Sequence, residues 1–251
     1  MTVVVFTGPT LPPSDARGEL DACYLPPVSE GDVYRAALEG PRAIGIVDGY
    51  FENVPSVWHK EILYAMSRGI RVYGSASMGA LRAAELAQFG MFGVGATFEA
   101  YRDGIIEDDD EVAIVHGPGE LGYPMLSEAM VNIRRTLSDA HADGVIGALA
   151  REGLEQIAKA LPYRERAYHA ILSLGRDAGV AEDEISQFSD WLPTGRVDQK
   201  REDAVLMLQV MREQLRTGGP ATEKPFHFEH TTLWEQATRR AVQAYDLPTE
   251  T

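Results

Sequence analysis

Residues 72–85 read VYGSASMGALRAAE, and this stretch decides the predicted fold. The valine and tyrosine at its start are typical of a buried strand, and the alanine-rich remainder is typical of a helix. Only small residues lie between the two. We therefore predict that a strand ends near Tyr73 and that a helix begins near Met78. Such short strand-to-helix turns are typical of α/β proteins with a mostly parallel sheet.

The sequence on either side extends this pattern. Short β-branched stretches, each followed by a Gly or Pro turn, predict strands over 3–6, 43–47, 70–73 and 112–115. Helical spacing of apolar residues predicts helices over 32–39, 55–68 and 78–88. The prediction for residues 1–125 is an α/β core domain, with a mostly parallel sheet flanked by helices.

The composition changes after Pro124, where Ala, Leu, Arg and Glu recur at helical spacing. Helices are predicted over 126–140, 145–161, 164–178, 182–192, 197–216 and 233–245. Gly and Pro residues separate these segments. We predict that residues 126–251 form a helical region, either a small bundle or a cap over the first half.

Composition excludes several classes of function. The chain has 251 residues, with 23 Lys and Arg against 38 Asp and Glu, and a formal net charge of −15. Because nucleic-acid binding requires clustered cations, nucleic acid is not expected as a partner. The lone Cys23 has no internal disulfide partner, and no segment approaches the roughly 20 apolar residues of a membrane span. We expect a globular cytoplasmic protein without a membrane partner.

Ser77, in the turn, is the candidate nucleophile. The stretch from Ser75 to Gly79 matches a small-x-Ser-x-Gly pattern, in which a tight strand-to-helix turn exposes a serine hydroxyl at the carboxyl edge of the sheet. The N–H groups of Met78 and Gly79 would then stabilise a developing oxyanion. Because Ser75 replaces the first glycine of the pattern, an ordinary helix N-cap serine is the alternative interpretation.

A serine nucleophile needs a base, and the preceding helix offers two. Lys60 is the only lysine of residues 1–125, and a desolvated lysine can lose its proton, whereas an arginine does not. However, Lys60 lies opposite the apolar face formed by Trp58 and Ile62, a position typical of a solvated charge. His59, at the edge of that face, is the other candidate base.

Two turns at strand ends are candidate binding elements. Thr7 and Gly8 follow the first predicted strand, and Asp48 and Gly49 follow the second. The carboxyl ends of parallel strands share one edge, which is the usual ligand side. Either turn can line a substrate pocket or supply an oxyanion donor; alternatively, the glycines merely release the chain from the strand.

Other motifs favour structural interpretations. Arg82 is a candidate substrate-binding residue, but with Glu85 it forms a spacing typical of an ion pair on a helix face. The acidic run 107–111 lacks the spacing of a cation site, and the six histidines form no metal set with the single cysteine. The sequence GMFGVG at 90–95 lacks the preceding strand of a dinucleotide fingerprint. No metal and no cofactor are expected.

Several segments together resemble the TfuA-like family. They are PPV at 26–28, GDV at 31–33, DGYF at 48–51, VPSVWHKEIL at 54–63, residues 74–85, GMFGVG at 90–95 and DDEVA at 109–113. Their combination is far more specific than the serine turn alone. The resemblance does not extend to the helical remainder.

This resemblance implies a function. TfuA-like proteins are partners of YcaO-type ATP-dependent enzymes, which convert peptide backbone amides into thioamides. The family is understood to hydrolyse the C-terminal thiocarboxylate of a small ubiquitin-like sulfur carrier protein, which releases sulfide for the partner, and to help the partner bind its peptide. The family's Ser-Lys pair falls by motif on Ser77 and Lys60. The expected function is therefore an accessory hydrolase for peptide backbone thioamidation.

In the implied reaction, neutral Lys60 accepts the proton of Ser77 as the serine oxygen attacks the thiocarboxylate carbon. The N–H groups of Met78 and Gly79 hold the oxyanion, sulfide leaves, and water releases the acyl group. Two other functions stay open. One is a non-catalytic adaptor that docks the peptide and the sulfur carrier onto the YcaO enzyme, and the other is a general serine esterase.

Overall fold

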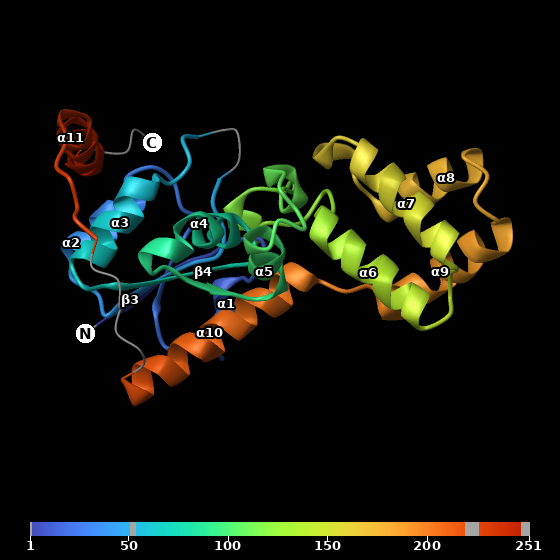
Figure 1. Cartoon of the computed structure of the whole chain (residues 1–251), viewed down its shortest axis with the longest axis horizontal. Helices are drawn as coiled ribbons and strands as arrows, with labels where there is room; N and C mark the ends of the chain where they lie inside the picture. Colours follow the sequence, from blue (N-terminus) through green and yellow to red (C-terminus); the bar gives the residue numbers. More distant parts are fainter. Residues whose placement is uncertain (1, 51–53, 219–225, 247–251) are drawn as a thin grey trace. The chain divides into compact units, whose positions relative to one another are not determined.

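The computed structural model describes residues 2–50, 54–218 and 226–246 (Figure 1). Phe51 of the DGYF motif lies outside these residues. Contacts between residues divide the chain into two compact units. The first unit combines Met1–Ile105 with Arg201–Thr251, and the second is Ile106–Lys200. The predicted domains were 1–125 and 126–251, whereas here the second unit begins at Ile106 and the chain returns to the first unit after Lys200.

The first unit contains a five-stranded parallel sheet. Its strands are β1 (Val3–Phe6), β2 (Cys23–Leu25), β3 (Ala43–Ile46), β4 (Arg71–Ser75) and β5 (Phe92–Val94). The spatial order is β2-β1-β3-β4-β5, and every neighbouring pair is parallel. The loops after β1, β3 and β4 therefore lie at one edge of the sheet. The predicted α/β class with a parallel sheet is confirmed.

Helices cover both faces of this sheet (Figure 1). They are α1 (Pro13–Ala16), α2 (Asp32–Leu38), α3 (His59–Ser67), α4 (Met78–Leu86), η1 (Ala87–Phe89), α5 (Ala96–Arg102), α10 (Gln199–Thr217) and α11 (Thr232–Asp246). Strand side chains alternate between the two faces. Ile44 and Val72 pack in one core with α2, α3, α4 and α5, whereas Ala43 and Tyr73 pack in the opposite core with α10.

Helix α10 supplies most of the helical cover of that second face. Its residues Met207, Leu208 and Met211 are fully buried. Gly45 of β3 allows the helix to approach closely, since a Cβ at this position would lie 3.0 Å from the sulfur of Met211. The sheet of the first unit therefore depends on a helix that follows the second unit in the chain.

The second unit is helical. It contains η2 (Asp109–Glu111), η3 (Gly119–Leu121), α6 (Met130–Ala142), α7 (Ala148–Ala160), η4 (Tyr163–Glu165), α8 (Tyr168–Asp177) and α9 (Glu182–Gly195). Its apolar core is built from α6, α7, α8 and α9, with Leu137, Leu154 and Phe188 fully buried. The predicted helical second half is confirmed. Across the described residues, no helix is long and apolar enough to cross a membrane.

The predicted strand over 112–115 is wrong. The segment is irregular, although Val112 and Ala113 are buried. Its backbone groups bond outside the sheet: the Val112 carbonyl accepts from Lys200 Nζ at 2.8 Å, the Val115 N–H donates to Ser127 Oγ at 2.7 Å, and the Val115 carbonyl accepts from the Leu126 N–H at 2.8 Å. The β-branched residues of 112–115 therefore indicate a buried segment and not a strand.

Strands β2 and β5 were not predicted. Each has only three residues, and β5 lies inside the GMFGVG motif, directly before α5. The motif follows η1 and contains β5, so no strand precedes it, as the sequence indicated. In addition, the carboxylate of Asp203 accepts hydrogen bonds from the N–H groups of Ala96 and Thr97, at 2.9 and 2.8 Å. The position that a phosphate occupies in a dinucleotide site is therefore filled by the chain itself.

Candidate active site

The turn between β4 and α4 holds Ser77 at the carboxyl edge of the sheet. The Ser77 N–H donates to the Ser75 carbonyl at 2.7 Å, and the intervening Ala76 has φ +65°. A hydrogen bond across a single residue of positive φ defines a strained γ-turn. Such strain costs about 1–3 kcal/mol and clusters at functional sites. The turn therefore fixes Ser77 at an energetic cost, which is a feature of the predicted nucleophile elbow.

Glycines on both sides of this turn bring α4 against the sheet. A Cβ at Gly74 would lie 2.1 Å from the carbonyl oxygen of Gly79, and a Cβ at Gly79 would lie 1.8 Å from the carbonyl oxygen of Ile46. Both positions exclude any side chain. Gly79, which completes the small-x-Ser-x-Gly pattern, is therefore required for the packing of α4 against the sheet. This requirement holds whether or not Ser77 is catalytic.

The Ser77 side chain does not cap the helix. Ser77 occupies the N-cap position of α4, but its hydroxyl makes no capping hydrogen bond, and the described residues offer it no other partner. The residue is 8% exposed. In contrast, Ser75 Oγ lies within hydrogen-bond distance of two carbonyl oxygens, those of Val94 at 2.7 Å and Asp203 at 2.9 Å. The N-cap interpretation therefore does not account for the Ser77 hydroxyl.

The N–H groups of Met78 and Gly79, the two predicted oxyanion donors, differ in whether they already have a hydrogen-bond partner. The Gly79 N–H donates to the Val47 carbonyl at 3.2 Å, so it is already engaged, which does not agree with its predicted role. The Ala80 N–H donates to the Ser77 carbonyl at 2.9 Å. The Met78 N–H, at the first position of α4, has no partner within the described part of the chain. Met78 is therefore the open donor at this helix start.

Asp48 ties together the loops that follow β1 and β3. Its carboxylate accepts hydrogen bonds from the Gly8 N–H at 2.9 Å, the Thr10 N–H at 3.0 Å and Thr10 Oγ1 at 2.6 Å. Thr7 and Asp48 are both buried. The structure thus brings Thr7, Gly8 and Asp48 together at the predicted edge, but the Asp48 charge serves the protein's own loop.

Gly49 lies beside the start of α4. A Cβ at this position would lie 2.8 Å from Met78 Cγ and 3.2 Å from the Val28 carbonyl oxygen. The loop after β3 is therefore adjacent to the turn that carries Ser77. A side chain at position 49 would displace the residue that offers the open N–H.

Lys60 lies in the first turn of α3 and is half-buried. Its Nζ donates to Thr231 Oγ1 at 3.1 Å and lies 5.5 Å from the ring centroid of Phe228. Among the residues described, no hydrogen bond joins Lys60 to Ser77. The structure thus places both predicted catalytic residues in one unit but does not bring their reactive atoms into contact.

His59 and Arg82 converge on Glu85. His59 Nε2 lies 2.7 Å from Glu85 Oε2, and Arg82 Nη1 donates to the same oxygen at 2.8 Å. Arg82 Nε also donates to the Val57 carbonyl at 3.1 Å, which joins the segment before α3 to α4. Burial raises the pKa of Glu85, but the hydrogen bonds from His59 and Arg82 outweigh it, so the pKa is lowered overall. The predicted Arg82–Glu85 ion pair is confirmed, and His59 is bound to Glu85.

The partners of Lys60 were not predicted from the sequence. Thr231 lies 171 residues further along the chain. Trp234 of α11 contacts the rings of Tyr34 of α2, edge to face, and Tyr64 of α3, with ring centroids 5.3 Å apart in each pair. Helical periodicity predicted α11 but carries no information about which surface it covers.

The acidic run forms an ion-pair cluster in the second unit. Carboxylate oxygens of Asp108, Asp110 and Glu111 lie within 4.8 Å of one another, a spacing that a metal ion can bridge. Lys159 Nζ lies between them, at 2.9, 2.6 and 2.9 Å respectively. An ammonium group therefore occupies the position that a cation would take. The acidic run is therefore part of a partly buried ion-pair cluster.

No curated protein matches the sequence. The sequence model of a family described as TfuA-like protein matches residues 48–167. The match includes Asp48, Lys60 and Ser77, and it continues past the motif at 109–113 into the second unit. Over these residues, slightly less than half of its length, the chain is similar to TfuA-like proteins.

Proposed function

We propose that this chain is a cytoplasmic accessory hydrolase for peptide backbone thioamidation, which releases sulfide from a thiocarboxylated ubiquitin-like sulfur carrier for a YcaO-type partner. One observation carries the proposal. The Ser77 hydroxyl stands at a strained strand-to-helix turn, beside the open Met78 N–H, and makes no hydrogen bond within the described residues. An uncommitted hydroxyl at such a turn is suited to nucleophilic attack.

The proposed reaction needs only the carrier thiocarboxylate, Ser77, Lys60 and water, and no cofactor. Ser77 Oγ attacks the thiocarboxylate carbon, its proton passes through Lys60 to the departing sulfur, and hydrosulfide leaves an ester on Ser77. Water then attacks the ester, which regenerates the serine and releases the carrier carboxylate. The Met78 N–H stabilises the oxyanion in both steps.

The proposal requires Lys60 to change its partner. The Lys60 side chain must leave Thr231 and turn towards Ser77, because the present hydrogen bond directs its amine to the segment before α11. A lysine side chain has four rotatable bonds and changes rotamer readily at a half-buried position.

The decisive experiment measures sulfide release by the purified protein from thiocarboxylated carrier. We expect Ser77→Ala to lower turnover by at least about a thousandfold while the melting temperature is retained. Ser67→Ala is the matched control, because Ser67 is an exposed serine at the end of α3 whose Oγ bonds only its own helix carbonyl at Tyr64. Undiminished sulfide release by Ser77→Ala would reject the catalytic role.

A second variant tests Lys60. Thr231→Val removes the hydroxyl that holds Lys60, so we expect sulfide release to rise by up to about fivefold, because the hydrogen bond that competes for the Lys60 amine is lost. The same hydroxyl accepts from the Trp234 N–H at 3.2 Å, so the melting temperature is measured alongside. Thr238→Val is the control, since the Thr238 hydroxyl bonds the Glu235 carbonyl within α11. A fall in turnover with Thr231→Val alone would show that the Lys60–Thr231 contact is needed in the active protein.

The same Lys60–Thr231 contact favours a second candidate function, a non-catalytic adaptor that docks the peptide and the carrier onto the YcaO enzyme. In that case, the hydrogen bond from the Lys60 amine has a structural role and links α3 to the segment before α11. The purified protein would release no sulfide, yet it would tighten peptide binding by the partner. A calorimetric titration of peptide into the partner, with and without this protein, separates the two functions.

A further inference from the structure

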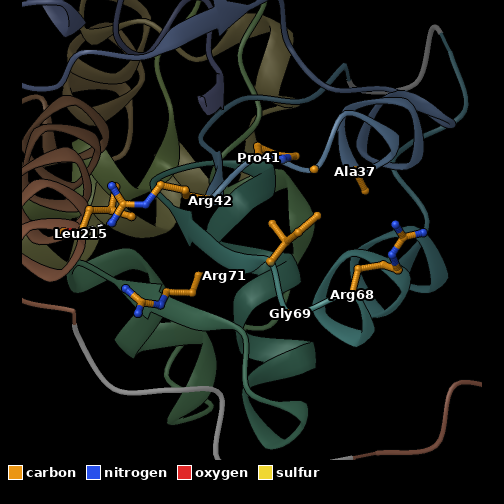
Figure 2. A pocket seen from close by; sticks show the side chains of 9 residues that line it. Ala37, Pro41, Arg42, Arg68, Gly69, Arg71 and Leu215 are labelled. Carbon is orange, nitrogen blue, oxygen red and sulfur yellow. Dashed lines mark hydrogen bonds between the residues drawn. The ribbon is translucent and has the colours of Figure 1, made fainter. Parts of the chain in front are cut away.

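A hollow of about 330 Å³ lies at the amino edge of the sheet, in the first unit (Figure 2). Its lining comes from the residues that lead into β3 and β4 and from the end of α10. Ser77 follows the carboxyl end of β4, so the hollow lies at the opposite edge from the candidate active site. Its volume is within the usual range for small-molecule sites.

Three arginines line this hollow, and none of its nine lining residues is acidic. They are Arg42 before β3, Arg71 at the start of β4 and Arg68 at the end of α3. In the part of the chain that the structure describes, none of the three forms an ion pair with a carboxylate. Glu39 and Glu213 are near lining residues in the sequence, but they do not line the hollow. A local excess of positive charge is therefore present on a chain whose net charge is −15.

Arg42 and Arg71 are held in place by the end of α10. Arg42 Nη2 donates to the Leu215 carbonyl at 2.8 Å, and Arg71 Nη1 donates to the Gln214 carbonyl at 3.2 Å. Figure 2 shows both side chains extending to the Leu215 side of the hollow. These carbonyl groups orient the guanidinium groups without neutralising their full charges. Arg71 Nη2 also donates to the Gly218 carbonyl. Each guanidinium carries five N–H donors, so both still have donors for a ligand.

Arg68 stands on the opposite side of the hollow (Figure 2) and has a different environment. It is exposed, its Nη1 donates to the Tyr64 hydroxyl at 2.9 Å, and its guanidinium lies over the Tyr64 ring at 5.7 Å. No carbonyl of α10 engages it. Its charge therefore contributes to the hollow without a role in anchoring that helix.

Two glycines are among the residues that line the hollow. Gly40 and Gly69 have φ of +63° and +79°, and a Cβ at either position would meet no atom within 4 Å. The positive φ values explain why glycine is present, and the empty space around both residues leaves room for a ligand.

We infer that this hollow binds a small polyanion through paired contacts from Arg42, Arg68 and Arg71. The guanidinium fork matches the oxygens of phosphate and carboxylate groups, and charges on two sides favour a ligand with more than one such group. The site is independent of Ser77 and of the hydrolysis proposed above. The alternative is that the arginines only anchor α10 and cover α3.

Isothermal titration calorimetry with sodium pyrophosphate and with sodium citrate, at low ionic strength, tests this site. We expect saturable binding of at least one anion, weakened about tenfold or more by Arg68→Ala and restored in part by Arg68→Lys. Pyrophosphate binding alone assigns a phosphate ligand, and citrate binding alone assigns a polycarboxylate.

Arg17→Ala is the matched control. Arg17 is also an exposed arginine over a tyrosine ring, 5.5 Å from the Tyr24 centroid, but it does not line the hollow. We expect this variant to bind as the unmodified protein does. Absence of saturable binding for both anions, or equal weakening by Arg17→Ala and Arg68→Ala, would overturn the proposal.

Discussion

Buried carboxylates are satisfied by different donors in the two units. In the first unit, Glu61 accepts from the backbone N–H groups of Gly31, Tyr34 and Trp58, at 2.9, 3.2 and 3.2 Å. Asp48 and Asp203 likewise accept from backbone N–H groups of loops and of α5. These side chains fix the ends of helices and the turns that follow strands.

In the second unit, cationic side chains take this role. Glu111 is nearly fully buried, and its two carboxylate oxygens accept hydrogen bonds from Arg134 Nε and Nη2, at 2.9 Å each. Glu128 pairs with Arg196 and accepts from Asn132 Nδ2 at 2.9 Å. The fully buried Arg166 binds both the carboxylate and the carbonyl of Asp110.

This difference has a physical consequence. Backbone donors are already fixed by the fold and carry no formal charge, whereas ion pairs require two charges to be desolvated together. The second unit should therefore respond more strongly to the loss of one charge and to acid. Fluorescence of Trp191 reports the second unit when Trp58 and Trp234 are replaced by Phe.

The largest effect is expected for Arg166→Met in the second unit. Arg166 Nη1 donates to the Asp110 carbonyl at 2.7 Å, and Nε donates to the Ala158 carbonyl at 3.1 Å. Removal of one buried partner should cost about 3–5 kcal/mol of unfolding free energy, measured by urea titration of Trp191 fluorescence. The control, Arg176→Met, breaks an exposed pair with Glu182 and should change stability by less than about 1 kcal/mol. Equal losses would contradict the comparison.

A smaller effect is expected for Asp48→Ala in the first unit. Three donors from Gly8 and Thr10 lose their acceptor, which should cost about 2–3 kcal/mol. Asp48→Asn keeps one acceptor oxygen and should cost less. Because all three donors, two backbone N–H groups and one hydroxyl, are neutral, added salt should not change either loss. A strong salt dependence in urea titrations would argue against this account.

The smallest effect is expected in the pH dependence of the unfolding free energy, to which Glu111 and Glu61 contribute with opposite sign. Burial raises the pKa of Glu111, but Arg134 and Lys159 lower it overall, so its stabilisation is present above the unfolded value near 4.5 and is lost as the pH falls through the folded pKa. Burial raises the pKa of Glu61 overall, so its protonation as the pH falls towards 4.5 favours the folded state.

Glutamine variants separate these responses. Glu111→Gln should remove part of the acid sensitivity of the second unit, and Glu61→Gln should flatten the opposite dependence in the first, each by on the order of 1 kcal/mol. Urea titrations at pH 7 and at pH 4 measure both. The same pH dependence in both units would refute the distinction.

The sequence predicted those parts of the molecule that depend on local pattern. The strand at β4, the start of α4 at Met78 and the placement of Asp48 at the carboxyl edge follow from periodicity and from the parallel topology. Strand β5 was too short to give a pattern. Contacts that join distant segments were not predictable, such as Lys60 with Thr231 and Gly79 N–H with Val47, because each depends on packing and not on neighbours in the chain.

The place of α10 in the chain has a consequence for synthesis. The cover of one face of the sheet is completed only after Met207, Leu208 and Met211 have been made, and these residues follow the entire second unit. As the polypeptide leaves the ribosome, the helices of the second unit can therefore assemble while Ala43 and Tyr73 are still exposed to water. A nascent chain arrested near residue 200 should engage chaperones and be readily cleaved in the segments around the sheet.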